Sequence, residues 1–187
     1  MEKLKKEIAA CCVCEQFLTE GCNPLVEVHP SNKILIIGHA PGLKVHRAGR
    51  LWEDKSGDNL RRWLGVDHHE FYHSNTFGLM PMGFCYPGKA ATGDHPPRPE
   101  CAPLWHHQIL EHLDNLELTL LVGKFAQNYY LQNKGSLTET VRNYQKFLPQ
   151  YLPLPHPSPR NFIWQGKNPW FQRELVPRIQ EMVQSLR

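Results

Sequence analysis

Four short apolar runs, separated by segments of helical character, limit the possible folds of this chain more than any other feature. The runs are KILIIG (33–38), FGLMPM (77–82), LTLLVG (118–123) and QYLPLP (150–155). Short apolar runs that lack a polar alternation are typical of strands buried on both faces of a sheet. Each run therefore predicts a strand of a buried, mostly parallel sheet.

Helical patterns lie before, between and after these runs. They cover residues 2–11, 57–65, 99–115, 124–132, 136–147 and 169–186. Strands that alternate with helices predict an α/β fold, here a three-layer α/β/α sandwich around a mostly parallel four-stranded sheet. The 187 residues contain no repeat and no low-complexity linker, so we expect a single domain over 1–187. In such sheets ligands bind outside the carboxyl ends of the strands, so the loops that follow the four runs should share one site.

Charge and hydropathy exclude some classes of protein. The formal net charge is only +3, which does not by itself indicate nucleic-acid binding, although basic residues gather between 43 and 62 and again after residue 156. No apolar stretch is long enough to span a membrane, and the first residues lack the apolar core of a signal peptide. We therefore expect a cytoplasmic monomer with no membrane partner.

The loop after the first run, GHAPGLKVHRAGRLWEDKSG (38–57), has the composition of a ligand-binding loop. Gly38, Pro41 and Gly42 predict a tight turn whose backbone N–H groups can approach a ligand closely. Ser56 and Gly57 precede a predicted helix, and the N-terminus of a helix is a favourable seat for a phosphate.

Four of the six cysteines have the spacing of a metal site. Cys11 and Cys14 form a C-x-x-C pair, and fifteen residues separate Cys85 from Cys101. Four thiolates suit a tetrahedral zinc ion or a [4Fe–4S] cluster, but cysteines also pack as small apolar side chains, and both interpretations stay open. We expect Cys12 and Cys22 not to be ligands. The histidines of 68–73 and 106–112 lack the spacing of a closed ligand set.

Three motifs in a fixed order carry a resemblance to a known family. GHAPG…GRLWEDKSG, FCYPG…PPRPEC and HPSPRN together resemble the uracil-DNA glycosylase superfamily, and LVGKFA (121–126) is similar to a further segment of it. The cysteine spacing resembles that of the iron–sulfur branch found in bacteria and archaea, whereas HPSPRN (156–161) is more similar to the single-strand-selective branch.

The resemblance implies an activity, a partner and a set of site residues. Members of the family flip a damaged nucleotide out of DNA and hydrolyse its N-glycosidic bond, so the implied partner is DNA that contains a damaged base, with uracil as the first candidate. His156 matches the histidine that donates a hydrogen bond to the leaving base. The implied substrate-binding residues are Gly38, Ala40, Pro41, Gly42, Trp52, Met82 and Phe84, with Trp52 stacking on the base. The implied DNA contacts are Ser56, Gly57, Ser158, Arg160 and Asn161. The implied cofactor is a structural [4Fe–4S] cluster on Cys11, Cys14, Cys85 and Cys101.

The chain departs from the family pattern at two positions. Ala40 stands where some branches have a water-activating Asp or Asn, so the first candidate for that role is Asp54 and the second is His39. Pro81 stands where many members have an asparagine that reads the base, and backbone groups around Met82–Phe84 could replace it. Because of these departures, a second function stays open, in which the protein binds damaged DNA and does not cleave it. A zinc-bound structural protein is a further alternative.

Overall fold

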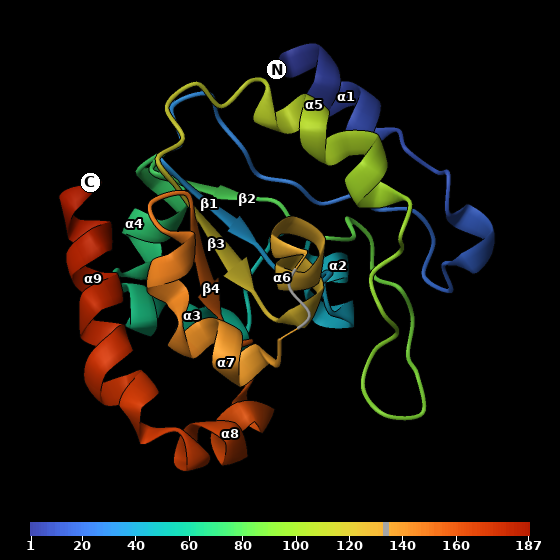
Figure 1. Ribbon diagram of the computed structural model, residues 1–187. Coiled ribbons are helices and arrows are strands. Elements are labelled where there is room, and N and C mark those ends of the chain that lie inside the picture. The colour runs from blue at the N-terminus through green and yellow to red at the C-terminus, as the bar shows by residue number, and fades with distance from the viewer. Residues whose placement is uncertain (133–134) are drawn as a thin grey trace.

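The computed structural model describes residues 1–132 and 135–187 and contains a four-stranded parallel sheet (Figure 1). The strands are β1 (Ile34–Ile37), β2 (Phe77–Leu79), β3 (Leu118–Val122) and β4 (Tyr151–Leu154), in the order β2-β1-β3-β4. Every neighbouring pair is parallel, with Ile34 opposite both Phe77 and Leu118, and Thr119 opposite Tyr151. All four predicted strands are thus confirmed.

Helices cover both faces of this sheet, as Figure 1 shows. The side chains of β1 alternate, so Ile34 and Ile36 join one buried apolar cluster and Leu35 and Ile37 join another. The first cluster is completed by α3 (Lys55–Leu64), α4 (His68–His73), α7 (Leu137–Arg142) and α9 (Val176–Ser185). The second is completed by α1 (Glu2–Ala9), α5 (His107–Leu110) and α6 (Lys124–Leu131). This is the predicted three-layer α/β/α sandwich.

The helices differ from the sequence-based expectation mainly at their ends and in short elements. Segment 99–115 forms a π-helical turn (Ala102–His106) that leads into α5, and segment 169–186 likewise begins with a π-helical turn (Phe171–Leu175) before α9. Segment 136–147 contains α7 and a 3₁₀ turn (Tyr144–Phe147). Further elements were not predicted: α2 (Leu43–Ala48), α4, α8 (Phe162–Lys167) and the 3₁₀ turns Glu15–Phe17 and Pro159–Asn161. Within residues 1–132 and 135–187, no helix is long and apolar enough to cross a membrane.

The carboxyl ends of the strands meet at one edge of the sheet. β1 leads into the loop that begins at Gly38, and β4 leads into the HPSPRN segment. β2 leads into a long connection, residues 80–101, which extends away from the sheet before it returns to the helical layer (Figure 1). These three connections surround the site described next.

Candidate active site

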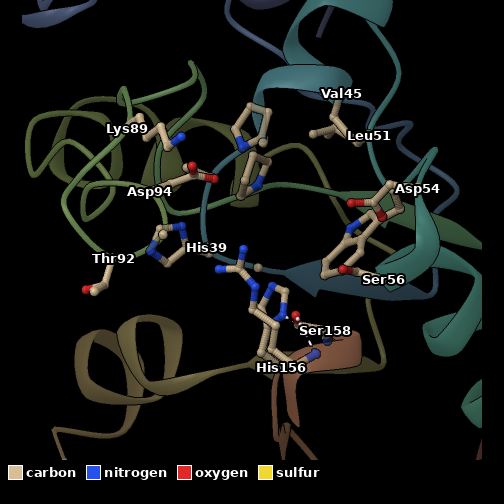
Figure 2. Close-up of a pocket in the computed structure, with 18 residues that line it drawn as sticks. His39, Val45, Leu51, Asp54, Ser56, Lys89, Thr92, Asp94, His156 and Ser158 are labelled. Atoms are coloured by element: carbon tan, nitrogen blue, oxygen red, sulfur yellow. Dashed lines mark hydrogen bonds between the residues drawn. The ribbon is translucent and has the colours of Figure 1, made fainter. Parts of the chain in front are cut away.

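A cavity of about 530 Å³ lies at this edge of the sheet (Figure 2). Its volume falls within the range of small-molecule sites. Eleven of the predicted site residues line it: Gly38, His39, Ala40, Pro41, Gly42, Trp52, Asp54, Ser56, His156, Ser158 and Arg160. The other lining residues are Val45, Leu51, Pro81, Lys89, Thr92, Gly93 and Asp94.

Polar side chains lie on two sides of the cavity (Figure 2). Asp54 and Ser56, from the start of α3, lie on one side. Lys89, Asp94 and Thr92 lie on the other side, next to His39. His156 and Ser158 come from the loop after β4 and lie between the two sides. A ligand in the cavity would therefore meet different chemistry on each side.

The hydrogen bonds of His156 fix which ring nitrogen carries its proton. The backbone N–H of Ser158 donates to Nδ1 of His156 over 3.2 Å, so Nδ1 is an acceptor. Burial lowers the pKa of His156 to about 4, chiefly by desolvation, so the ring is neutral near pH 7. In a neutral ring whose Nδ1 accepts, the proton is on Nε2. His156 thus presents an N–H donor that needs no external proton.

The loop around His156 is held by two asparagine side chains. Asn161 Nδ2 donates to the His156 carbonyl over 2.7 Å, and Asn59 of α3 donates to the Pro157 carbonyl over 2.8 Å. Asn161 does not line the cavity, so its place is behind the loop rather than in the cavity wall. Arg160 does line it, and a Cβ at Gly93 would lie 3.7 Å from Nη1 of Arg160, so the guanidinium reaches the opposite side of the cavity mouth.

Trp52 lies beside His156 in an unusual backbone conformation. Its φ is +60°, which is rare for a bulky residue and found where the surroundings hold the chain in place. The ring centroids of Trp52 and His156 are 5.9 Å apart, and a Cβ at Gly38 would lie 2.7 Å from the indole. The indole therefore packs on the start of the first loop, with no room there for a larger residue than glycine.

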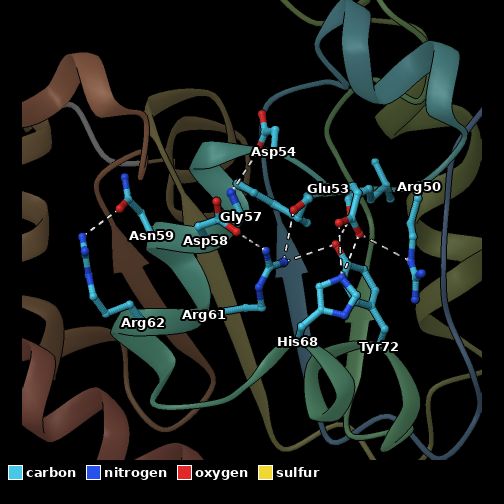
Figure 3. A network of polar contacts seen from close by, with 12 residues as sticks. Arg50, Glu53, Asp54, Gly57, Asp58, Asn59, Arg61, Arg62, His68 and Tyr72 are labelled. Carbon is cyan, nitrogen blue, oxygen red and sulfur yellow. Dashed lines mark hydrogen bonds and ion pairs between the residues drawn. The ribbon is translucent and has the colours of Figure 1, made fainter.

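A buried arginine holds the backbone of Trp52 in place (Figure 3). Arg61 Nη1 donates to the Trp52 carbonyl over 3.2 Å, and its other amino group pairs with Asp58 at 2.6 Å. The hydroxyl of Tyr72 donates to the Leu51 carbonyl over 2.7 Å. These bonds come from α3 and α4, so the two helices set the position of the indole.

Asp54 is both a lining residue and the N-cap of α3. Its Oδ1 accepts a hydrogen bond from the Gly57 N–H over 2.9 Å. Its negative charge also acts on His156, whose pKa it raises against the larger effect of desolvation. Gly57 is buried below Trp52 and does not line the cavity. Gly57 therefore contributes close packing rather than direct contact.

The residues that follow β2 are hydrogen-bonded through their backbone N–H groups to the loop after β1. The N–H of Met82 donates to the Gly38 carbonyl over 2.9 Å, and the N–H of Gly83 donates to the His39 carbonyl over 3.1 Å. Met82 and Phe84 are buried and do not line the cavity. These two N–H groups hold the first loop, and the expectation that backbone groups around Met82–Phe84 replace the missing asparagine stays a prediction.

A polar hairpin on the far side of the cavity was missed from the sequence. Lys89 and Asp94 pair as an antiparallel bridge, and the Ala90 N–H donates to the Gly93 carbonyl over 3.0 Å. The hydroxyl of Tyr86 donates to Asp94 Oδ1 over 3.3 Å. Glycine at the turn was the available signal, but nothing in the sequence placed the hairpin beside the first loop.

The four cysteines with ligand spacing surround one small pocket away from the cavity. Cys11, Cys14, Cys85 and Cys101 line it together with Leu18, Pro24, Phe84, Arg98 and Trp105. Cys14, Cys85 and Cys101 are buried, whereas Cys12 is exposed. The pKa of Cys101 is raised to about 12, chiefly by desolvation and to a smaller extent by Cys14, Cys85 and Cys11. In the described part of the chain, no three His, Cys, Asp or Glu side chains have the arrangement of a closed metal site. The donor set nevertheless fits a thiolate-bound group, because two distant segments supply four thiols to one pocket.

The fold and the cavity define a class of protein: a three-layer α/β protein with a cavity of about 530 Å³ at the carboxyl edge of its sheet and a neutral histidine in the cavity wall. Comparison with family models gives a more specific result. The model of the uracil DNA glycosylase superfamily matches residues 26–180. The chain therefore belongs to the uracil-DNA glycosylase superfamily.

Proposed function

We propose that this protein is a monofunctional DNA glycosylase that takes a deaminated or damaged base into the cavity, with uracil as the first candidate, and hydrolyses its N-glycosidic bond. The observation that carries the proposal is the neutral His156 with its proton on Nε2. A leaving base develops negative charge on its carbonyl oxygen, and a fixed N–H donor stabilises that charge as it forms.

In the proposed reaction the glycosidic bond breaks and its electron pair moves onto the base. The oxygen of a water molecule bonds to C1′ of the sugar, and the water proton passes to a general base of the protein, from which a proton is returned to the base anion. Asp54 is the first candidate for that general base and for stabilising the cationic sugar, because its carboxylate lines the side opposite the hairpin. His39 is the second candidate. The products are a free base and an abasic site.

The remaining lining residues have proposed roles in holding DNA. Trp52 offers a large aromatic face for the flipped base to stack on. Ser56 lies near the N-terminus of α3 and Ser158 lies in the loop after β4, where both can contact phosphates on either side of that base. Arg160, exposed at the mouth, can contact or enter the DNA helix.

An oligonucleotide excision assay tests the proposal. Strands containing uracil, hypoxanthine, xanthine or mismatched thymine, single- and double-stranded, are incubated with the wild type and with His156→Ala. We expect excision of at least one base, and a loss of about a hundredfold or more in His156→Ala. Excision that is unchanged in His156→Ala would contradict the mechanism.

A non-catalytic protein that binds damaged DNA is the second candidate. It is favoured by Ala40, and by Asp54 using one carboxylate oxygen as a helix cap. Tight binding to abasic DNA with no excision of any base in the panel would support this candidate and reject the first.

We further propose that Cys11, Cys14, Cys85 and Cys101 hold a structural [4Fe–4S] cluster. When bound, such a cluster ties the N-terminal segment to the 85–101 connection and takes no part in hydrolysis. Protein purified without oxygen should be brown and contain iron and sulfide. Cys101→Ser should lose this iron, whereas Cys12→Ser, which changes an exposed thiol outside the pocket, should keep it. Colourless wild-type protein with stoichiometric zinc would contradict the cluster.

A further inference from the structure

The hairpin at residues 88–95 forms a wall of the cavity to which the proposed reaction gives no role. Its two ends are joined, because the His95 N–H donates to the Gly88 carbonyl over 2.9 Å. Gly88 and Gly93 have φ values of +94° and +80°, which glycine adopts without strain. The hairpin is thus a defined element that presents Lys89, Thr92 and Asp94 to the cavity.

The Asp94 carboxylate has acceptor sites that remain available. Oδ1 accepts the Tyr86 hydroxyl, and Oδ2 lies on the side of the first loop, 3.9 Å from where a Cβ at Gly42 would stand. Among residues 1–132 and 135–187, no lysine or arginine forms an ion pair with Asp94. A carboxylate can accept about four hydrogen bonds, so Asp94 can accept further donors from a ligand.

His39 lies next to Asp94 and can supply the complementary donor. Desolvation lowers the pKa of His39, against the smaller opposite effect of Asp94, so its imidazole is neutral near pH 7. Its ring contacts the edge of Phe125, with centroids 5.0 Å apart, and makes no hydrogen bond to a side chain in the described part of the chain. A neutral imidazole has one N–H donor, and Figure 2 shows His39 on the same side of the cavity as Asp94.

The position that reads the base in many family members cannot do so here. Pro81 has no polar side chain, and its carbonyl accepts a hydrogen bond from His106 Nε2 over 3.1 Å. The next two N–H groups, of Met82 and Gly83, hold the first loop. A side chain that reads the base must therefore come from another wall of the cavity.

We propose that Asp94 and His39 together read the Watson–Crick edge of the flipped base and select a lactam edge, in which a ring N–H lies beside a carbonyl. This inference rests on the proposed function, because it assigns the specificity of the same cavity. Asp94 accepts from the ring N–H and His39 donates to the carbonyl.

The chemistry of deamination explains why this pair would be useful. Deamination of cytosine or adenine replaces a ring nitrogen acceptor and an amino donor with a ring N–H donor and a carbonyl acceptor. Uracil and hypoxanthine therefore present a donor to Asp94 and an acceptor to His39, whereas cytosine and adenine present an acceptor to Asp94 and a donor to His39. A wrong edge would place the carboxylate against a ring lone pair and leave both protein groups without a partner, which is the strongest form of discrimination a polar site achieves.

A binding experiment tests the assignment without relying on turnover. Oligonucleotides carry 2′-fluoro-2′-deoxyuridine or 2′-fluoro-2′-deoxycytidine at one position, since the fluorine slows glycosidic cleavage and leaves the base edge intact. We expect the wild type to prefer the uracil probe by about tenfold or more, and Asp94→Asn to reduce that preference to about threefold or less, because the amide can present a donor or an acceptor. Affinity for abasic DNA should stay the same in Asp94→Asn, since the abasic site has no edge to read.

A matched control separates reading of the base from support of the hairpin. Tyr86→Phe removes the hydroxyl that bonds to Asp94 but keeps the carboxylate, so it should keep the preference for the uracil probe. Equal preference in the wild type and Asp94→Asn, or no preference in the wild type, would overturn the assignment. Excision of ordinary deoxyuridine is measured in parallel and tests the proposed glycosylase activity separately. A preference for the uracil probe that depends on Asp94, without excision, would reject the glycosylase activity and keep the assignment of Asp94.

Discussion

Asp54 combines a structural and a proposed chemical role in one carboxylate, and two substitutions can separate them. An asparagine at position 54 can still accept the Gly57 N–H and cap α3, but it carries no charge and is a poor base. Asp54→Asn should therefore keep the thermal midpoint of the wild type and lose about a hundredfold or more in excision rate. Asp54→Ala should lose both the rate and about 1 kcal/mol of stability, since the cap is also removed. Equal excision rates in Asp54→Asn and the wild type would assign the water-activating role elsewhere, with His39 the next residue to test.

His156 gives a prediction about pH at the same scale. Its pKa of about 4 lies below the ordinary value of 6.5, so the ring keeps its neutral form, with Nε2–H as donor, as the solution is acidified through pH 6. The single-turnover excision rate should therefore show no loss from protonation of His156 between about pH 8 and about pH 5. Titration of the His156 ring signals by NMR checks the same point directly. A midpoint near 6.5 would contradict the neutral-donor argument.

At the scale of an element, the start of α3 can be tested through one glycine. A Cβ at Gly57 would lie 1.7 Å from the Trp52 carbonyl oxygen, so Gly57→Ala must push the helix and the Trp52 segment apart. We expect a loss of about 2 kcal/mol or more in stability and weaker binding of a base-containing probe. Gly166→Ala in α8 is the matched control, because no atom lies within 4 Å of its added Cβ. That variant should be neutral or about 0.5 kcal/mol more stable, and a similar loss in both variants would contradict the packing argument.

The elements also show what the sequence could predict and what it could not. The four strands and the residues directly after them were predictable, because buried apolar runs mark parallel strands and parallel strands bring their carboxyl ends together. Helices α2 and α4, of six residues each, were missed because such short helices depend on tertiary packing more than on periodicity. The hairpin that carries Asp94 was missed for a related reason. Its turn is polar and glycine-containing, and only its contacts in the folded chain place it beside His39.

At the scale of the whole molecule, the buried His106 connects the layer of α5 and α6 to Pro81, which lines the cavity. His106 Nε2 donates to the Pro81 carbonyl, and the ring is therefore protonated at that nitrogen. In the neutral ring, Nδ1 accepts the Tyr130 hydroxyl over 2.7 Å. Burial lowers the pKa of His106 to about 4. Because burial opposes the charged ring, the stability of the fold should fall as the solution is acidified.

The direction of this effect follows from proton binding in the folded and unfolded states. Above pH 6.5, the ordinary value, the ring is neutral in both states and has no effect on the pH dependence. Between 6.5 and about 4 the unfolded chain binds a proton that the folded protein does not, so the free energy of unfolding falls as pH falls, by at most about 1.4 kcal/mol per pH unit for this group. The glutamine of His106→Gln cannot titrate. This variant should be less stable than the wild type at pH 7, and the difference in their free energies of unfolding should be about 2 kcal/mol smaller at about pH 5. Thermal midpoints of the wild type and His106→Gln, measured at both pH values, check this change in the stability difference. If the stability difference between His106→Gln and the wild type stayed constant with pH, the pKa of His106 would be the same in the folded and unfolded states, and the argument that burial lowers it would be wrong.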